Sequence, residues 1–195
     1  YWPMPAEYDA IANYDYKAQV FFQKGTITDI TSTWRASYPY FTSLGHTIMY
    51  FLGFQNPKLF YSFVVLGFTL VFYAWLARRS NHVSALIGSL LLLTTPIVFN
   101  QSRIAYTNFS YMAYFSIGLL YLLDYFDSPK SHTLLISSIF ISIPVWIRPA
   151  HYPFFAVTLL LVIGYLGIMR TKLNLNKRIK QVTFFVIPFL IIFVP

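Results

Sequence analysis

The chain has 195 residues, of which 57% are hydrophobic, 21% aromatic and only 10% charged, and this composition excludes an ordinary soluble domain. The absence of cysteine excludes disulfides, zinc–thiolate sites and thiol nucleophiles. A formal net charge of +8 does not indicate nucleic-acid binding here, because the basic residues lie between apolar runs, where membrane orientation requires them. The apolar runs are about twenty residues long, which predicts an all-α, polytopic protein of the lipid bilayer.

The first stretch, EYDAIANYDYKAQVFFQKG (residues 7–25), holds three of the six carboxylates of the chain. Its spacing predicts an amphipathic helix with Asp9, Asn13 and Lys17 on one face. The opposite, apolar face suits a helix that lies on a membrane, and it consists of Tyr14, Ala18, Phe21 and Phe22. A carboxylate at the mouth of a membrane bundle is a functional-site hypothesis, and a solvated surface helix without a role is the alternative.

A polar, turn-rich stretch follows, and then YPYFTSLGHTIMYFLGF (residues 38–54), which is apolar but short for a membrane span. It contains His46, and Gly53 and Pro57 stop it. We interpret it as a second interfacial helix. Residues 1–58 are therefore predicted to form a first extracytoplasmic loop with interfacial helices.

Residues 59–195 are predicted to form a transmembrane bundle of about six spans. The candidate spans are residues 59–77, 83–100, 105–125, 132–147, 150–169 and 181–195. The chain starts at Tyr1 rather than Met, and it stops inside an apolar run. We therefore expect a piece of a larger protein, with a further span before residue 1 and more chain after residue 195.

The basic residues predict the orientation of these spans. Eight of the fourteen fall in three connections on one side: Arg78, Arg79, Lys130, Arg170, Lys172, Lys177, Arg178 and Lys180. The opposite connections hold only Arg103 and Arg148. The positive-inside rule puts the basic side in the cytoplasm, so residues 1–58, Arg103 and Arg148 share the outer face of a multi-pass plasma (inner) membrane protein.

Two outer turns carry candidate binding residues. In WIRPAHYP (residues 146–153), Pro149 fits the first turn of a new helix, so Arg148 stands beside free backbone N–H groups, as a phosphate site would require. In FNQSRIAYTNFSY (residues 99–111), Arg103, Tyr106 and Asn108 stand where they could bind a hydroxylated or anionic group. The alternatives are an arginine that reaches the lipid headgroups, and polar capping within an aromatic belt.

The four histidines show no metal-ligand spacing. His46 and His151 share the predicted outer face with Asp9, and they could converge with it. No glycine-rich phosphate loop is present.

Several of these segments resemble one family in the same order along the chain. EYDAIANYDYKA (residues 7–18) is similar to the WDAL..W..KA form of a first outer loop, and YPYF (residues 38–41) with LGF (residues 52–54) is similar to a P-P-L…F-G juxtamembrane helix. LARRS, RIAYTNFSYMAYF and WIRPAHY fall where that family has a cytoplasmic basic turn, an outer entry to a span, and a Lys or Arg. The chain thus resembles the GT-C membrane glycosyltransferases, specifically the bacterial and archaeal relatives of protein O-mannosyltransferases and aminoarabinose transferases. It departs from the family's acidic pair, because Asp9 stands alone after Glu7, and Asn108 replaces an Asp of many relatives.

The resemblance implies a GT-C-like helical bundle and inverting transfer of a sugar from a polyprenyl-phosphate donor to a hydroxyl of a protein or glycolipid on the outer face. Asp9 would be the general base, with Asp15 as the second choice, and Arg148, or more weakly Arg103, would bind the donor phosphate. Substrate-binding roles would fall to Lys17, Tyr106, Asn108 and His151. The resemblance implies no organic cofactor, and a divalent metal requirement stays open.

Two other classes fit the sequence: a fragment of a transporter or flippase for lipid-linked glycans, and an inactive membrane scaffold. A transporter should have paired charges or broken helices near the middle of the membrane. The predicted span interiors are nearly uncharged, which favours chemistry at the membrane surface.

The predicted orientation can be tested by single-cysteine labelling, because the chain has no cysteine of its own. An impermeant maleimide should label a cysteine at position 35 from outside the cell, and one at position 172 only after permeabilisation. Labelling of position 35 only from inside would overturn the orientation and the placement of the site.

Overall fold

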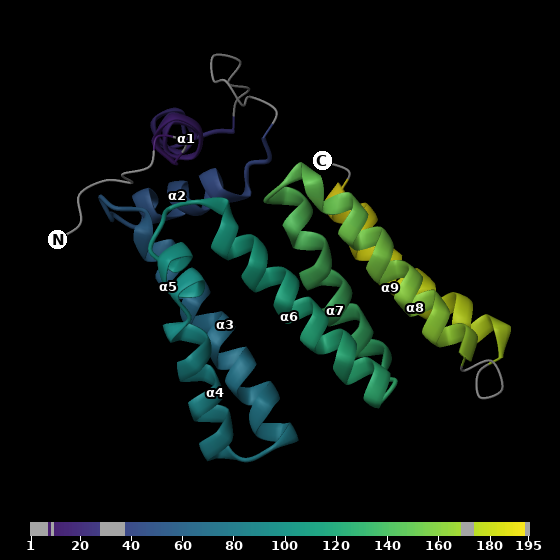
Figure 1. The fold of residues 1–195 in the computed structure, drawn as a ribbon. Helices are drawn as coiled ribbons and strands as arrows, with labels where there is room; N and C mark the ends of the chain where they lie inside the picture. The colour runs from purple at the N-terminus through teal and green to yellow at the C-terminus, as the bar shows by residue number, and fades with distance from the viewer. Residues whose placement is uncertain (1–7, 9, 28–37, 169–173, 194–195) are drawn as a thin grey trace. The chain divides into compact units, whose positions relative to one another are not determined.

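The computed structural model describes residues 8, 10–27, 38–168 and 174–193, and among these residues it contains helices and no strand (Figure 1). The chain divides into two compact units between Ala113 and Tyr114. The all-helical prediction is confirmed.

The first unit opens with a helical pair, in the part of the chain where both interfacial helices are predicted. A π-helical turn, η1 (Ala10–Asp15), leads into α1 (Tyr16–Lys24), which packs against α2 (Phe41–Phe51). Glycines end both helices: Gly25, with φ of 66°, donates its N–H to the Phe21 carbonyl, and Gly53, with φ of 83°, follows α2. Figure 1 shows the pair at the end of the first unit where α3 begins.

The predicted division of the first helix into a polar and an apolar face is wrong in part. Tyr14, Ala18 and Phe21 are buried as expected, but Phe22 is 43% exposed. Asn13 and Lys17 are buried with the apolar residues. All of these buried residues lie on one arc of the helix, and α2 packs against both η1 and α1 and covers that arc.

The remaining helices fall on the six predicted apolar segments. They are α3 (Lys58–Arg79), α4 (His82–Thr94), α5 (Pro96–Ser102), α6 (Thr107–Asp127), α7 (Ser131–Ser142) with the 3-10 turns η2 (Ile143–Trp146) and η3 (Pro149–His151), α8 (Tyr152–Ile168) and α9 (Leu175–Phe193). In the first unit α3 packs against α4, and in the second unit α9 packs against both α7 and α8 (Figure 1).

Two of the described helices are long and apolar enough to cross a membrane: Lys58–Arg79 and Pro149–Ile168. The pair α4 and α5 provides a third span if its two helices are counted as one, and they meet at an angle of 68°. The bend has a local cause, because Pro96 lacks the N–H needed to continue α4 and instead occupies the first turn of α5. Of the roughly six spans that the sequence predicts, two or three are thus supported by the length and composition of the described helices.

The core of the second unit brings α6 and α7 into close contact at Gly118. The Ser137 hydroxyl donates a hydrogen bond of 2.8 Å to the Gly118 carbonyl. A Cβ atom at position 118 would lie 2.5 Å from Ile141 Cγ1 and 2.8 Å from the Ile141 backbone nitrogen. Only glycine permits this approach of the two helices.

We therefore predict that Gly118→Ala destabilises the protein. Overpacking costs about 1–3 kcal/mol, which exceeds the gain of about 1 kcal/mol in helix propensity from glycine to alanine. Thermal unfolding followed by tryptophan fluorescence in detergent should show a lower midpoint than wild type. Gly164→Ala is the matched control, since no atom lies within 4 Å of its new Cβ and its midpoint should not fall. A Gly118→Ala midpoint at or above that of Gly164→Ala would contradict the packing described.

Candidate functional site

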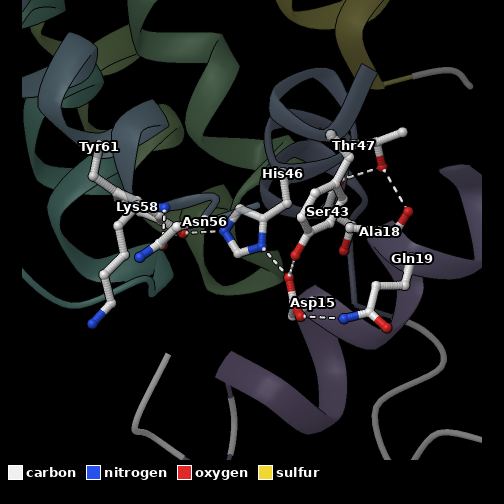
Figure 2. Close-up of polar contacts among 10 residues, drawn as sticks. Asp15, Ala18, Gln19, Ser43, His46, Thr47, Asn56, Lys58 and Tyr61 are labelled. Atoms are coloured by element: carbon white, nitrogen blue, oxygen red, sulfur yellow. Dashed lines mark hydrogen bonds and ion pairs between the residues drawn. The ribbon is translucent and has the colours of Figure 1, made fainter. Parts of the chain in front are cut away.

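The Asp15 carboxylate is the centre of a buried polar cluster in the first unit (Figure 2). Asp15 ends η1 and is 3% exposed. Its Oδ2 atom accepts a hydrogen bond of 2.8 Å from Gln19 Nε2 on α1. Its Oδ1 atom accepts one from the Tyr50 hydroxyl on α2 and lies 3.4 Å from His46 Nδ1. Donors from two helices thus converge on one carboxylate.

A second polar layer lies behind the carboxylate. His46 is fully buried, and its Nε2 atom lies 2.9 Å from the hydroxyl of Tyr61 on α3. A carboxylate only accepts hydrogen bonds, so the neutral imidazole carries its proton on Nδ1, and Tyr61 donates to Nε2. Figure 2 shows the His46 ring between Asp15 and Tyr61. This row of three side chains connects η1, α2 and α3.

A threonine holds α1 and α2 in register beside this row. The Thr47 hydroxyl lies 2.8 Å from the Ser43 carbonyl in its own helix and 3.3 Å from the Ala18 carbonyl of α1 (Figure 2). The contact fixes the distance between the two helices at the level of Asp15. The geometry of the carboxylate therefore depends on helix packing and not on a flexible loop.

Burial would raise the pKa of the Asp15 carboxyl, but the contacts with His46, Tyr50 and Gln19 outweigh burial and leave its pKa below the ordinary value of 3.8. Burial lowers the pKa of His46 below 6.5, although the nearby Asp15 opposes this shift. Burial and the Asp15 charge raise the pKa of Tyr50. At neutral pH the cluster is thus one carboxylate anion held by neutral donors.

A pocket of about 240 Å³ opens on the carboxylate. It is lined by Asp15, Gln19, Phe22, Gln23, Tyr50, Gln55 and Pro57. Pockets for drug-sized ligands have volumes of about 300–1,000 Å³, so this one suits a smaller group. Three glutamine amides can donate to and accept from hydroxyl groups, and one side is apolar, as a sugar ring or a hydroxylated acceptor would require.

Of the other predicted site residues in the first unit, Lys17, Arg103, Tyr106 and Asn108 do not line this pocket. Asp9 lies outside the described residues. Lys17 is buried with its Nζ atom 3.4 Å from the Tyr38 carbonyl and 5.2 Å from the centre of the Tyr40 ring, and burial lowers its pKa. The other three residues make contacts elsewhere in the first unit. The Tyr106 ring packs 5.6 Å from that of Tyr14, and Asn108 donates to Gln101 over 2.7 Å. Arg103 lies over the Phe99 ring.

Arg148 and His151 belong to the second unit. Arg148 has an extended backbone directly before η3, which Pro149 begins, so the predicted helix start after Arg148 is confirmed. His151 is fully buried, with Nε2 2.7 Å from the Ile141 carbonyl and its ring 5.2 Å from that of Phe115. In this position it joins η3 to α7. The convergence of Arg148 with the acidic site stays a prediction.

Sequence reasoning named Asp15 only as a second choice and did not assign His46, Tyr50 or Gln19 to the site. A signal for them exists in the spacing. Asp15 and Gln19 are four residues apart on one helix, and His46 and Tyr50 are four residues apart on the next. Two such polar pairs on neighbouring apolar helices are a reason to expect that the helices face each other through them.

The described residues contain no group of three or more His, Asp or Glu side chains arranged to hold a metal ion. Comparison of the chain with protein-family models, curated proteins and solved structures finds no match.

The pKa of His46 predicts how stability depends on pH. The unfolded chain takes up a proton near pH 6.5, whereas folded His46 takes it up only at lower pH. Because the unfolded state binds more protons in this range, stability should fall as the pH falls below 6.5. Asp15 adds a second loss below pH 3.8, where the unfolded carboxyl is protonated first.

Urea unfolding at several pH values would test this dependence. His46→Gln should lose less stability than wild type as the pH falls below 6.5. The matched control is His82→Gln, which removes an exposed histidine in place of the buried one. An unchanged slope in His46→Gln would contradict the buried, neutral state of His46.

Proposed function

We propose that this protein is a membrane glycosyltransferase that uses a polyprenyl-phosphate-linked sugar, with Asp15 as its general base. One observation carries the proposal: an ionised carboxylate, held by His46, Tyr50 and Gln19, faces a pocket of about 240 Å³ with amide-rich walls. The resemblance of the surrounding segments to GT-C enzymes supports the same activity.

The position of the pocket along the chain suits a lipid-linked donor. Pro57 lines the pocket, and the next residue, Lys58, begins α3, which is long and apolar enough to cross a membrane. A pocket at the end of such a helix would lie at the level of the lipid headgroups. The phosphate and sugar of a membrane-embedded polyprenyl phosphate would be found at that depth.

In the proposed reaction the acceptor hydroxyl oxygen attacks the anomeric carbon from the face opposite the phosphate. A new carbon–oxygen bond forms, the bond between the anomeric carbon and the phosphate oxygen breaks, and the polyprenyl phosphate leaves with the electron pair. Asp15 takes the proton of the acceptor hydroxyl. A positioned base of this kind contributes about a hundredfold to ten-thousandfold to the rate.

The partners of Asp15 explain how a carboxylate of low pKa serves as this base. Its ionised form is available at neutral pH, and the contacts with His46 and Tyr50 hold Oδ1 in one orientation. The proton need leave the acceptor only as the bond to the anomeric carbon forms, so position matters more than basicity. His46 and Tyr61 are positioning residues in this scheme.

The negative charge that develops on the leaving phosphate requires a cation. Arg148 is our candidate, because its guanidinium precedes the η3 turn that opens α8, and arginine binds phosphate with two parallel hydrogen bonds. Arg103 is the second candidate, since it is exposed at the end of α5.

A flippase or transporter for lipid-linked glycans is the second candidate function, and the bend of 68° between α4 and α5 favours it. Broken helices of this kind form substrate sites in transporters. The polar side chains at this break are Thr94 and Thr95, whose hydroxyls bond to carbonyls of α4 itself. The break therefore presents less polar chemistry than the Asp15 pocket does.

Replacing Asp15 by Asn should lower sugar transfer by at least about a hundredfold, because the side chain keeps its size but no longer accepts the proton. Donor binding should persist. The measurement is transfer from polyprenyl-phosphate mannose and polyprenyl-phosphate aminoarabinose by the complete protein in vesicles, together with donor binding to the same variant.

Asp127→Asn is the control, since it removes an exposed carboxylate at the end of α6 and should transfer at the wild-type rate. Asp9→Asn tests the base named first from the sequence. A loss confined to Asp9→Asn would move the base to Asp9. Wild-type turnover by Asp15→Asn and by Asp9→Asn would refute the general-base role of both residues. Donor flipping without any transfer would favour the transporter.

A further inference from the structure

A second pocket, in the second unit, lies between α8 and α9 and has a volume of about 320 Å³. Its walls are largely apolar. They are formed by Ile163, Leu166 and Gly167 of α8 and by Ile179 and Val182 of α9. The hydroxyl of Thr183, which also lines it, donates to the Ile179 carbonyl of its own helix over 3.0 Å. This leaves one strongly polar lining residue, Arg178.

Arg178 is a cation in an otherwise apolar wall. Its Nε atom is buried and has no hydrogen-bond partner in the part of the chain that the structure describes. A buried guanidinium N–H without an acceptor costs free energy, so a ligand oxygen at this place would stabilise the side chain. None of the described residues that line the pocket is acidic, so none of these side chains is a carboxylate that could supply that oxygen.

The position of the pocket along α8 indicates the source of the oxygen. Gly167 stands at the last turn of α8, about 22 Å along the helix axis from Tyr152 if each residue rises about 1.5 Å. Because α8 belongs to a stretch apolar enough to cross a membrane, its last turn would lie at a membrane surface. Lys177 and Lys180 stand near Arg178 in the first turns of α9, but of these three basic residues only Arg178 lines the pocket.

We propose that this pocket is a binding site for one anionic phospholipid: the phosphodiester pairs with Arg178, and the first part of an acyl chain lies against Ile163, Leu166 and Val182. The complementarity of charge and apolar surface carries the assignment, because basic pockets between membrane helices bind acidic headgroups. The site lies on other helices than the Asp15 pocket, and the assignment holds whether or not the protein transfers sugars.

Photo-cross-linking tests the proposal with the complete protein in phosphatidylcholine vesicles. The probe is phosphatidylglycerol with a photoreactive diazirine in one acyl chain, and the adducts are mapped by mass spectrometry. Wild type should be labelled on peptides that contain residues 163–167 and 179–183. One lost Lys or Arg contact at a membrane surface weakens lipid binding by about 1 kcal/mol, so Arg178→Gln should lower this labelling about fivefold.

Two further variants distinguish a specific lipid-binding pocket from a general attraction of anionic lipid to basic residues. Lys177→Gln removes one positive charge from the neighbouring residue, which does not line the pocket, and should leave labelling near wild type. Gly167→Leu keeps every charge but fills the pocket, since no atom lies within 4 Å of its new Cβ, and it should lower the labelling as Arg178→Gln does. Labelling of α3 peptides, which face lipid in any folded variant, shows that each variant has inserted.

Equal labelling of the pocket in wild type, Arg178→Gln and Gly167→Leu would overturn the proposal. So would equal labelling by a phosphatidylcholine probe, because the site would then not select an anionic headgroup. Loss of labelling in the presence of inorganic phosphate would assign the pocket to free phosphate and would likewise overturn the lipid site.

Discussion

The burial of the Asp15 charge is the constraint on which the first unit depends. A carboxylate that is 3% exposed loses most of its hydration, and this loss is tolerated only when donors replace the water. Here the donors are Gln19 of α1 and Tyr50 of α2. The His46 imidazole lies 3.4 Å from the carboxylate and is itself held by Tyr61 of α3. One charge therefore fixes the relative positions of three elements, and any change in their packing would leave it without a partner.

Under the proposed function, this arrangement would separate two tasks that a membrane-surface enzyme must combine. The apolar helix α3 suits a bilayer, whereas the short helices at its start carry the ionised group. A carboxylate in the middle of a span would be expensive, but at the end of one it can face a polar pocket. The chemistry can thus take place next to the membrane without a charge inside it.

Packing and hydroxyl groups help to hold the described helices of the second unit together. Ser138 donates to the Phe185 carbonyl, Tyr165 donates to the Phe126 carbonyl over 2.9 Å, and the rings of Phe155 and Phe189 stack 3.7 Å apart. Such contacts let apolar helices associate where water does not drive them together. Among the described residues of this unit, three buried polar atoms have no hydrogen-bond partner: Tyr125 Oη, Gln181 Oε1 and Arg178 Nε. Of these three residues, Arg178 alone carries a charge and lines the pocket between α8 and α9.

The sequence by itself determined where the helices lie. Runs of apolar residues, the stops at Gly25 and Gly53 and the start at Pro149 are local signals, and local backbone preferences decide such boundaries. The family resemblance also brought Asp15 into consideration, although behind Asp9. Only the tertiary structure showed the partners of Asp15. His46 lies 31 residues from Asp15 along the chain and reaches it through the packing of α1 on α2. The packing of α2 also decided which arc of α1 is covered, so that Lys17 is buried and Phe22 is exposed. The burial of a side chain depends on the neighbour that covers it, and no pattern within one helix identifies that neighbour.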